Sequence, residues 1–256
     1  MNIIVCVKQT VDLQQVRIRK ETREPVLDNI PLTIGNIDKN ALEEAVRIRD
    51  KVGGKVIAVS AGSEQLTDTI KEALAMGADE AILVISTEFE GADSGAAAAA
   101  LAQAIKRVED YGIILLGEGS ADNYSGQVGP RLAEILDLPQ VTYVSSLEVE
   151  NGTIKAVRNL DDCFETVEVG VPAVVSVVSE INEPRIPSVT QILKAGKKPK
   201  QVFKPEDLGI EITRSITTLS NLAPDQDRKR ILFQEGTDKD VASLVSALEA
   251  EGLVRR

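Results

Sequence analysis

The residues best suited to chemistry lie in one loop, residues 115–130, with the sequence LLGEGSADNYSGQVGP. An apolar run at 111–116 has the length of a buried strand, and it stops at Gly117 and Gly119, where small polar residues begin. Residues 127–136 then have the pattern of an amphipathic helix. Free backbone N–H groups and the helix dipole favour phosphate at such a junction. A turn that needs small residues only for its geometry is the alternative, and this stretch alone leaves both interpretations open.

Ordinary catalytic groups are scarce in this chain of 256 residues. It has no histidine, which excludes Ser-His-Asp and Cys-His nucleophilic catalysis and histidine-bound metals. The two cysteines, Cys6 and Cys163, are too few for a disulfide framework or a cysteine zinc site. We therefore expect no catalytic residue and no metal site, and we expect Cys6 to be a buried thiol within a strand.

The composition indicates a soluble globular protein with a full core, since 43% of the residues are hydrophobic. The formal net charge of −11 argues against nucleic acid as a partner, because no excess of lysine and arginine is available to contact phosphates. No apolar run approaches the roughly 20 residues of a membrane span. The first residues enter a strand rather than a cleavable leader. We expect a cytoplasmic protein without direct membrane insertion.

Strands and helices alternate on both sides of the loop. Apolar runs predict buried strands, and periodic apolar residues predict a helix between each strand and the next. The predicted strands are residues 2–8, 55–61, 80–85 and 111–116, and the predicted helices are 39–51, one that opens at 62–63, and 91–108. Asp38 is expected to cap the helix at 39–51. This order predicts an α/β fold with a doubly wound, mostly parallel, Rossmann-like sheet.

The pattern changes after Pro139. Residues 141–149, 153–157 and 165–169 alternate polar and apolar side chains and are joined by turns such as Asn151-Gly152. This pattern predicts an antiparallel β addition. A continuous buried strand follows at 172–179.

Prolines from Ile181 onward and a basic run at 194–200 indicate an arm rather than a core. Residues 238–249 form an amphipathic helix capped by Thr237. We predict an α/β nucleotide-binding domain at 1–203 and an extended C-terminal arm ending in a helix at 204–256. This helix packs either on another subunit or back on the sheet, and the sequence leaves both open.

Loops at the carboxyl ends of parallel strands meet at one edge of a sheet, so they are expected to rim one crevice. These loops are residues 6–9, 35–38, 61–62 and 117–128. The crevice suits an adenine nucleotide whose phosphate is held by backbone N–H groups and by Ser120, Asn123 and Ser125. Asp122 stands where the third glycine of a Rossmann fingerprint belongs, and no Walker sequence occurs.

Several segments carry a family resemblance. They are NIIVCVKQ at the start, NALEEAVRIRD at 40–50, EALAMGADEAILV at 72–84, the loop LLGEGSADNYSGQVGP and NEPRIPSVTQILKAGKK at 182–198. A further pattern of a basic residue, an acidic pair, a glutamate and a proline is met by Arg158, Asp161, Asp162, Glu165 and Pro172. Together these segments resemble the β subunit of electron transfer flavoproteins.

The resemblance implies a heterodimer in which an α subunit holds a redox-active FAD and this chain binds an adenine nucleotide itself. That nucleotide is a structural AMP in the conventional branch of the family and a second FAD, reduced by NADH, in the electron-bifurcating branch. Matched residue by residue, the contacts fall on Cys6, Gly35, Asn36, Ile37, Asp38, Ala61, Gly117, Glu118, Gly119, Ser120, Ala121, Asp122, Asn123, Tyr124, Ser125, Gly126, Gln127 and Val128.

Departures from the family pattern leave FAD and AMP both open. Bifurcating relatives usually have a basic residue where Glu118 stands, so its acidic side chain favours AMP. Asp122 and Gln127 are retained, and the pair at 162–163 is similar to that of some anaerobic members, which favours FAD. The resemblance also implies that Val189 anchors a loop that docks on acyl-CoA or other dehydrogenases, with a core valine as the alternative.

Three classes of function are weighed. An ATP-using enzyme of similar architecture would need an SGGxDS-like phosphate loop, which is missing. A non-redox nucleotide-sensing module has no use for the long arm and the lysine-rich segment. We therefore expect an electron-carrier β subunit, which supports electron transfer between dehydrogenases and a downstream acceptor through the flavin of the α subunit. NADH-dependent electron bifurcation is the extension of this role that a second FAD would permit.

Overall fold

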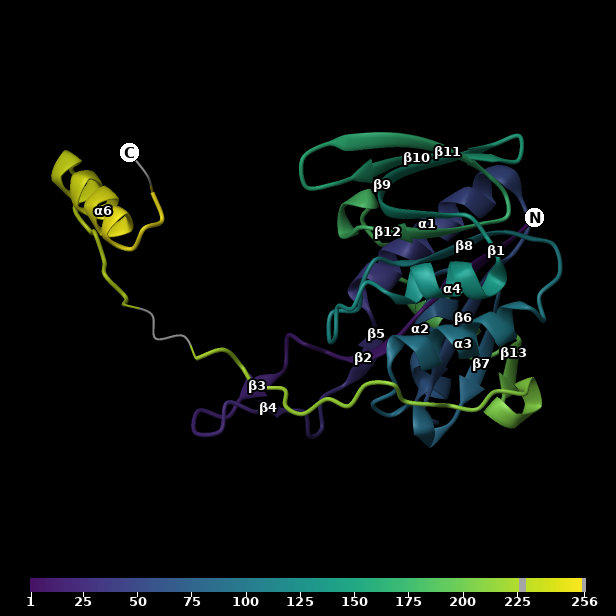
Figure 1. Ribbon diagram of the computed structural model, residues 1–256. Coiled ribbons are helices and arrows are strands. Elements are labelled where there is room, and N and C mark those ends of the chain that lie inside the picture. Colours follow the sequence, from purple (N-terminus) through teal and green to yellow (C-terminus); the bar gives the residue numbers. More distant parts are fainter. Residues whose placement is uncertain (226–228, 255–256) are drawn as a thin grey trace.

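A large mixed sheet forms the centre of the computed structural model, which describes residues 1–225 and 229–254. Its strands are β1 (Asn2–Cys6), β6 (Val56–Gly62), β7 (Glu80–Ile85), β8 (Tyr111–Gly117), β9 (Gln140–Glu150), β10 (Thr153–Asn159), β11 (Phe164–Gly170), β12 (Ala173–Val177) and β13 (Lys200–Phe203). The order across the sheet is β11-β10-β9-β12-β8-β1-β6-β7-β13 (Figure 1). From β9 to β13 neighbouring strands are parallel, whereas β10 and β11 pair antiparallel at one edge.

Helices cover both faces of this sheet. One face carries α1 (Asn36–Val52), α2 (Leu66–Met76) and α5 (Val189–Ala195), and the other carries α3 (Ser94–Ile105) and α4 (Val128–Leu136). Side chains of β1 alternate between them, because Ile3 and Val5 belong to the first core and Ile4 and Cys6 to the second. The predicted doubly wound, mostly parallel sheet with an antiparallel addition is confirmed.

Helix α1 differs from the prediction at its start. It begins at Asn36, three residues earlier than expected, and its N-cap is Gly35. The prediction that Asp38 caps this helix is therefore wrong. Asp38 lies in the first turn, where its carboxylate accepts hydrogen bonds from the backbone N–H groups of Lys8 and Gly117. The side chain ties α1 to the ends of two strands instead of closing its own helix.

The basic run near residue 198 also differs from the prediction of an arm. Strand β13 pairs with β7, and the Lys198 ammonium group donates to the carbonyls of Leu74 and Ala78 at the end of α2. The short helix η3 (Pro205–Leu208) follows, and Leu208 is buried in the second core. This part of the chain belongs to the sheet and its helices. The division between residues 203 and 204 stays a prediction.

Two small antiparallel sheets and a final helix complete the chain. The small sheets pair β2 (Gln9–Val11) with β5 (Leu32–Ile34) and β3 (Arg17–Ile18) with β4 (Pro25–Val26). Further short helices are η1 (Thr87–Phe89) and η2 (Ser179–Ile181). Helix α6 (Asp238–Ala250) is capped by Thr237, has no buried residue and lies away from the sheet at the end of the arm (Figure 1). Within residues 1–225 and 229–254, every helix falls short of the length and hydrophobicity that a membrane span requires.

Candidate functional site

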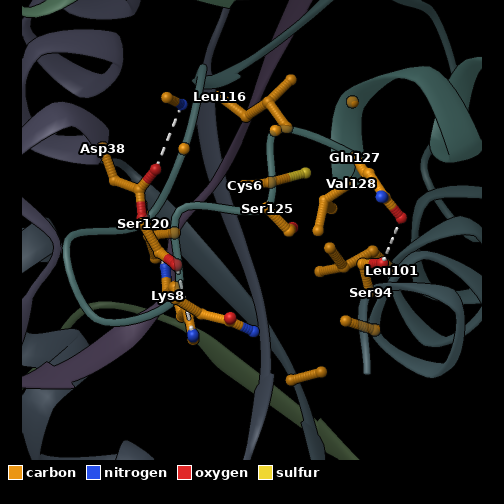
Figure 2. A pocket seen from close by; sticks show the side chains of 18 of the residues that line it. Cys6, Lys8, Asp38, Ser94, Leu101, Leu116, Ser120, Ser125, Gln127 and Val128 are labelled. Atoms are coloured by element: carbon orange, nitrogen blue, oxygen red, sulfur yellow. Dashed lines mark hydrogen bonds between the residues drawn. The ribbon is translucent and has the colours of Figure 1, made fainter. Parts of the chain in front are cut away.

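The predicted loops meet in a pocket at the carboxyl ends of β1, β6 and β8. The pocket lies between these strand ends and the N-terminal turns of α3 and α4 (Figure 2). The predicted site residues that line it are Cys6, Asp38, Ala61, Gly117, Glu118, Gly119, Ser120, Asn123, Ser125, Gly126, Gln127 and Val128. Residues from segments more than one hundred positions apart are thus brought together by the parallel order of the strands.

The other predicted site residues lie behind or beside the pocket. They are Gly35, Asn36, Ile37, Ala121, Asp122 and Tyr124. Ile37 packs against Gly117, where an added Cβ would stand 3.0 Å from the Ile37 Cβ and 2.8 Å from Asp38 Oδ1. Glycine is therefore required at 117 because the first turn of α1 approaches the strand end so closely.

One wall of the pocket was not predicted. It is formed by Phe89, Ala92, Asp93, Ser94, Ala97 and Leu101, from the segment after β7 and from α3. The strand order contained a signal for it, since the segment that follows 80–85 also starts at the carboxyl edge of the sheet. No conspicuous motif marks these small residues.

The lining divides into an apolar wall and a polar rim. Leu101, Leu116 and Cys6 are buried side chains of the wall. Burial, with a smaller effect of the Asp38 charge, raises the pKa of the Cys6 thiol, so this cysteine stays neutral and unreactive. Hydroxyl and amide groups on the loop after Gly117 form the rim. An apolar surface beside such donors suits a ligand with a flat ring system and a phosphate.

Asp38 occupies two backbone donors at the strand ends. Its Oδ2 lies 2.8 Å from the Lys8 nitrogen and its Oδ1 lies 3.1 Å from the Gly117 nitrogen. Burial raises the pKa of Asp38 to about 6, although these two hydrogen bonds oppose the shift. Since the carboxylate already uses both N–H groups, a ligand phosphate has to bind further along the loop.

The loop itself is folded tightly around Tyr124. Its backbone has a φ of 44°, and its ring lies over Gly119, where an added Cβ would stand 3.1 Å from a ring carbon. The Tyr124 hydroxyl donates to Glu118, and this hydrogen bond raises the pKa of Tyr124 to about 12. Gly126 has a φ of 65°, which favours glycine. These features fix the backbone of the loop at Gly119, Tyr124 and Gly126.

Two cations flank this loop, although residues 117–127 contain none. Lys8 Nζ lies 2.7 Å from Asp122 Oδ2. Burial of Asp122 opposes ionisation, but the hydrogen bonds from Lys8 and Ser120 outweigh it and lower the pKa of this carboxyl. Arg131, one turn into α4, donates from Nη2 to Gln127 Oε1 at 2.9 Å. Lys8 is thus anchored on the pocket lining, and Arg131 is anchored just beside it.

The two helix N-termini at the pocket differ in their capping. Asp93 caps α3, because its Oδ1 accepts from the N–H groups of Gly95 and Ala96 at 2.9 and 3.0 Å. The N-cap of α4 is Gln127, whose side chain makes no capping hydrogen bond. The first turn of α4 therefore presents N–H donors that an anionic ligand can satisfy, whereas α3 already holds a carboxylate.

Fold and pocket together define a Rossmann-like α/β protein with its candidate site at the carboxyl edge of a parallel sheet. Residues 26–208 match the electron transfer flavoprotein domain. The chain belongs to the electron transfer flavoprotein family, which places it among flavoproteins of electron transport.

Three relatives match between 82% and 99% of the chain. The electron transfer flavoprotein subunit beta of Thermoanaerobacterium thermosaccharolyticum is 39% identical over 261 residues, which cover 99% of this chain and 100% of the relative. The subunit of the same name from Bradyrhizobium diazoefficiens is 36% identical over 255 residues, 98% of each chain. Subunit CarD of the caffeyl-CoA reductase-Etf complex of Acetobacterium woodii is 37% identical over 211 residues, 82% of this chain and 80% of CarD. The resemblance to β subunits is confirmed.

Proposed function

We propose that the chain is the β subunit of a heterodimeric electron transfer flavoprotein and binds an adenine nucleotide in the pocket described above. The observation that carries this proposal is the apolar wall of Leu101 and Leu116 beside the uncapped N-terminus of α4. The wall suits the adenine ring and the helix terminus suits the phosphate. Electron transfer between dehydrogenases and a downstream acceptor then passes through the flavin of the α subunit.

The residues present fit such a nucleotide. Gly119 and Gly126 keep side chains out of the loop, and Ser120, Asn123 and Ser125 supply hydroxyl and amide donors on the lining. FAD in this pocket would supply redox chemistry, whereas AMP would be structural. The residues of this chain bind the adenosine and its phosphate, orient them and exclude water from the apolar wall.

FAD and AMP differ in the number of phosphate groups that the polar rim has to bind. A single phosphate needs only the N–H groups at the start of α4, which favours AMP. A pyrophosphate gains from a cation, and Lys8 can supply one only in competition with Asp122, to which it is bound. Electron bifurcation with NADH is the extension that a second FAD would permit. We keep both nucleotides as candidates.

An exposed apolar segment supports a docking role for the loop that contains Val189. Ile186, Val189 and Leu193 are 93%, 74% and 73% exposed. The alternative of a core valine does not agree with this exposure. The name of CarD places that relative in a complex with a caffeyl-CoA reductase. We extend this to the present chain as docking on an acyl-CoA or other dehydrogenase, in the cytoplasm.

Nucleotide content of the purified heterodimer tests the proposal. The chain is co-expressed with an electron transfer flavoprotein α subunit, and the extracted nucleotides are separated and counted. Two FAD per heterodimer with bleaching by NADH support bifurcation, and one FAD with one AMP supports the conventional role. Absence of any adenine nucleotide beyond the α-subunit FAD would reject the pocket as its site.

A matched pair of serine variants makes this test specific to the pocket. Ser125 lies on the lining, whereas Ser220 is exposed on the arm. Ser125→Ala is expected to lower the content of the second nucleotide, and Ser220→Ala is expected to leave it unchanged. A chain that binds AMP but neither pairs with an α subunit nor takes part in redox chemistry would favour the nucleotide-sensing alternative.

A further inference from the structure

Gln127 connects the two helices whose N-termini reach the pocket. Its side chain lies on the pocket wall, and its Oε1 accepts a hydrogen bond from Ser94 Oγ at 3.1 Å, drawn in Figure 2. The same oxygen accepts from Arg131 Nε at 3.2 Å and from Arg131 Nη2 at 2.9 Å. Donors from α3 and α4 thus converge on one atom of one side chain.

These donors determine which way the Gln127 amide faces. A guanidinium group has no acceptor, so a flipped amide would place its NH2 group against the N–H groups of Arg131. With Oε1 committed to Ser94 and Arg131, Nε2 is the polar group that Gln127 can offer to a ligand. The pocket lining includes Gln127 and Ser94 but, in the part of the chain described, not Arg131. The guanidinium group therefore acts on the pocket through Gln127.

We infer that Ser94 and Arg131 are positioning residues, which hold the Gln127 amide so that its Nε2 donates to a phosphate oxygen of the bound nucleotide. The inference rests on the proposed adenine-nucleotide site. Gln127 is also the N-cap of α4, so the residue that carries this amide directly precedes the N–H groups of the first turn. A phosphate bound to that turn meets the amide and the backbone donors together.

Replacing the donor by an acceptor tests the contact. In Gln127→Glu one carboxylate oxygen keeps the partners Ser94 and Arg131, while the other places a negative charge where Nε2 stood. Binding of AMP and of FAD to the full chain is measured by calorimetry, and affinity is expected to fall at least about tenfold. Glu134→Gln, an exposed change on the same helix away from the pocket lining, is the control and is expected to bind like the unmodified chain.

A second set of variants separates positioning from direct contact. Arg131→Met releases the amide and is expected to weaken AMP binding about threefold to fivefold. In a Gln127→Ala background the same substitution is expected to have no further effect, because the side chain through which Arg131 acts is gone. An Arg131 effect that persists in that background would show direct contact with the ligand and overturn the positioning role.

Folding and the parent proposal are checked separately. Gln127 and Arg131 are exposed, so the thermal unfolding midpoints of all variants are expected to match that of the unmodified chain. If the unmodified chain binds neither AMP nor FAD, the proposed function and this inference both fail. If it binds either nucleotide and Gln127→Glu binds it equally well, only the inference is overturned.

Discussion

The Asp38 carboxyl is buried and accepts hydrogen bonds from two backbone N–H groups. Its burial makes the free energy of unfolding depend on pH. Burial raises the pKa of Asp38 from 3.8 to about 6. Between these values the folded chain binds more protons at this site than the unfolded chain does, so its free energy of unfolding falls as the pH rises through that window. A shift of this size corresponds to a decrease of about 2–3 kcal/mol in the free energy of unfolding, and the decrease is complete above pH 6.

Asp38→Asn is expected to remove this component of the pH dependence. Asparagine stays neutral, although its NH2 group faces one of the two N–H donors and one hydrogen bond is lost. The measurement is the free energy of unfolding in urea at pH 4.5 and pH 7, with Glu109→Gln as an exposed control. If the difference between the two pH values is the same in Asp38→Asn as in the unmodified chain, the carboxyl is not the titrating group.

Helix α1 holds the segment before α5 through an ion pair whose carboxylate is buried. Glu43, 5% exposed at its side chain, lies 2.6 Å from Arg185 Nε and also accepts from the Arg185 backbone and from Arg47. Burial opposes ionisation of Glu43, but the hydrogen bonds from Arg185 and Arg47 lower its pKa. Asn40 and Asn182 add reciprocal bonds to each other's backbone carbonyls. The chain is thus fixed just before it becomes exposed at Ile186.

Arg185→Met is expected to destabilise the chain by about 2–3 kcal/mol, because Glu43 stays buried with only Arg47 as its charged partner. Urea unfolding measures the change, and digestion by proteinase K is expected to cut faster near α5. The matched control is Lys71→Met, which removes an exposed pair with Asp68 and is expected to change stability by less than about 0.5 kcal/mol. If both substitutions lower the free energy of unfolding equally, the ion pair between Glu43 and Arg185 has no special structural role.

Val189 carries the prediction for partner docking. Val189→Ala removes two methyl groups from an exposed side chain, so the fold is expected to be unaffected, while burial against a partner loses about 1.6 kcal/mol. The KM for an acyl-CoA dehydrogenase partner is expected to rise about tenfold with unchanged flavin content. Val202→Ala, at an exposed position of β13, serves as the control. Lost thermal stability with normal partner kinetics would count against the docking role.

Local sequence pattern was enough to predict most of the strands and helices that form the sheet and cover its faces. The strand at 80–85 was predicted with its observed bounds, because its apolar run lies between polar turns. The contact of Asp38 with Gly117 was beyond reach, since its partners are 79 positions apart and an acidic residue at a helix start usually caps it. Strand β13 was missed because it is a short edge strand next to a run of lysines. Both features depend on contacts between distant parts of the chain, Asp38 with Gly117 and β13 with β7, which local pattern does not contain.

The whole molecule consists of a packed α/β body and an arm that leaves it. Arg214 donates to the carbonyls of Glu88 and Glu90, and the backbone N–H of Ser215 donates to Asp93. Further along, the Ala223 nitrogen donates to the carbonyl of Arg23. The arm is therefore tied to the body next to the pocket, while α6 has no buried residue. The apolar side chains along one side of α6, Val241, Leu244 and Val245, therefore need a partner surface to bury them. We call these three residues the stripe.

The stripe on α6 leads to the prediction about assembly. Val241, Leu244 and Val245 are 57%, 42% and 42% exposed and share one side of the helix. We expect them to be buried by the α subunit, where each contributes about 1.5–3 kcal/mol. Replacing Val241 and Val245 together by serine should therefore weaken a 1:1 complex at least a hundredfold. The body should still unfold at the same temperature, because neither valine belongs to its two hydrophobic cores.

Size-exclusion chromatography of the chain mixed with an α subunit distinguishes the outcomes. The unmodified chain and a control with Ser243→Ala and Ser246→Ala, on the opposite side of α6, are expected to elute as a 1:1 complex. The variant with both valines replaced is expected to elute as separate subunits at micromolar concentration. If it still forms the complex as tightly as the control, the stripe does not bind the α subunit. If the unmodified chain is folded, monomeric and indifferent to the α subunit, the heterodimer itself is refuted.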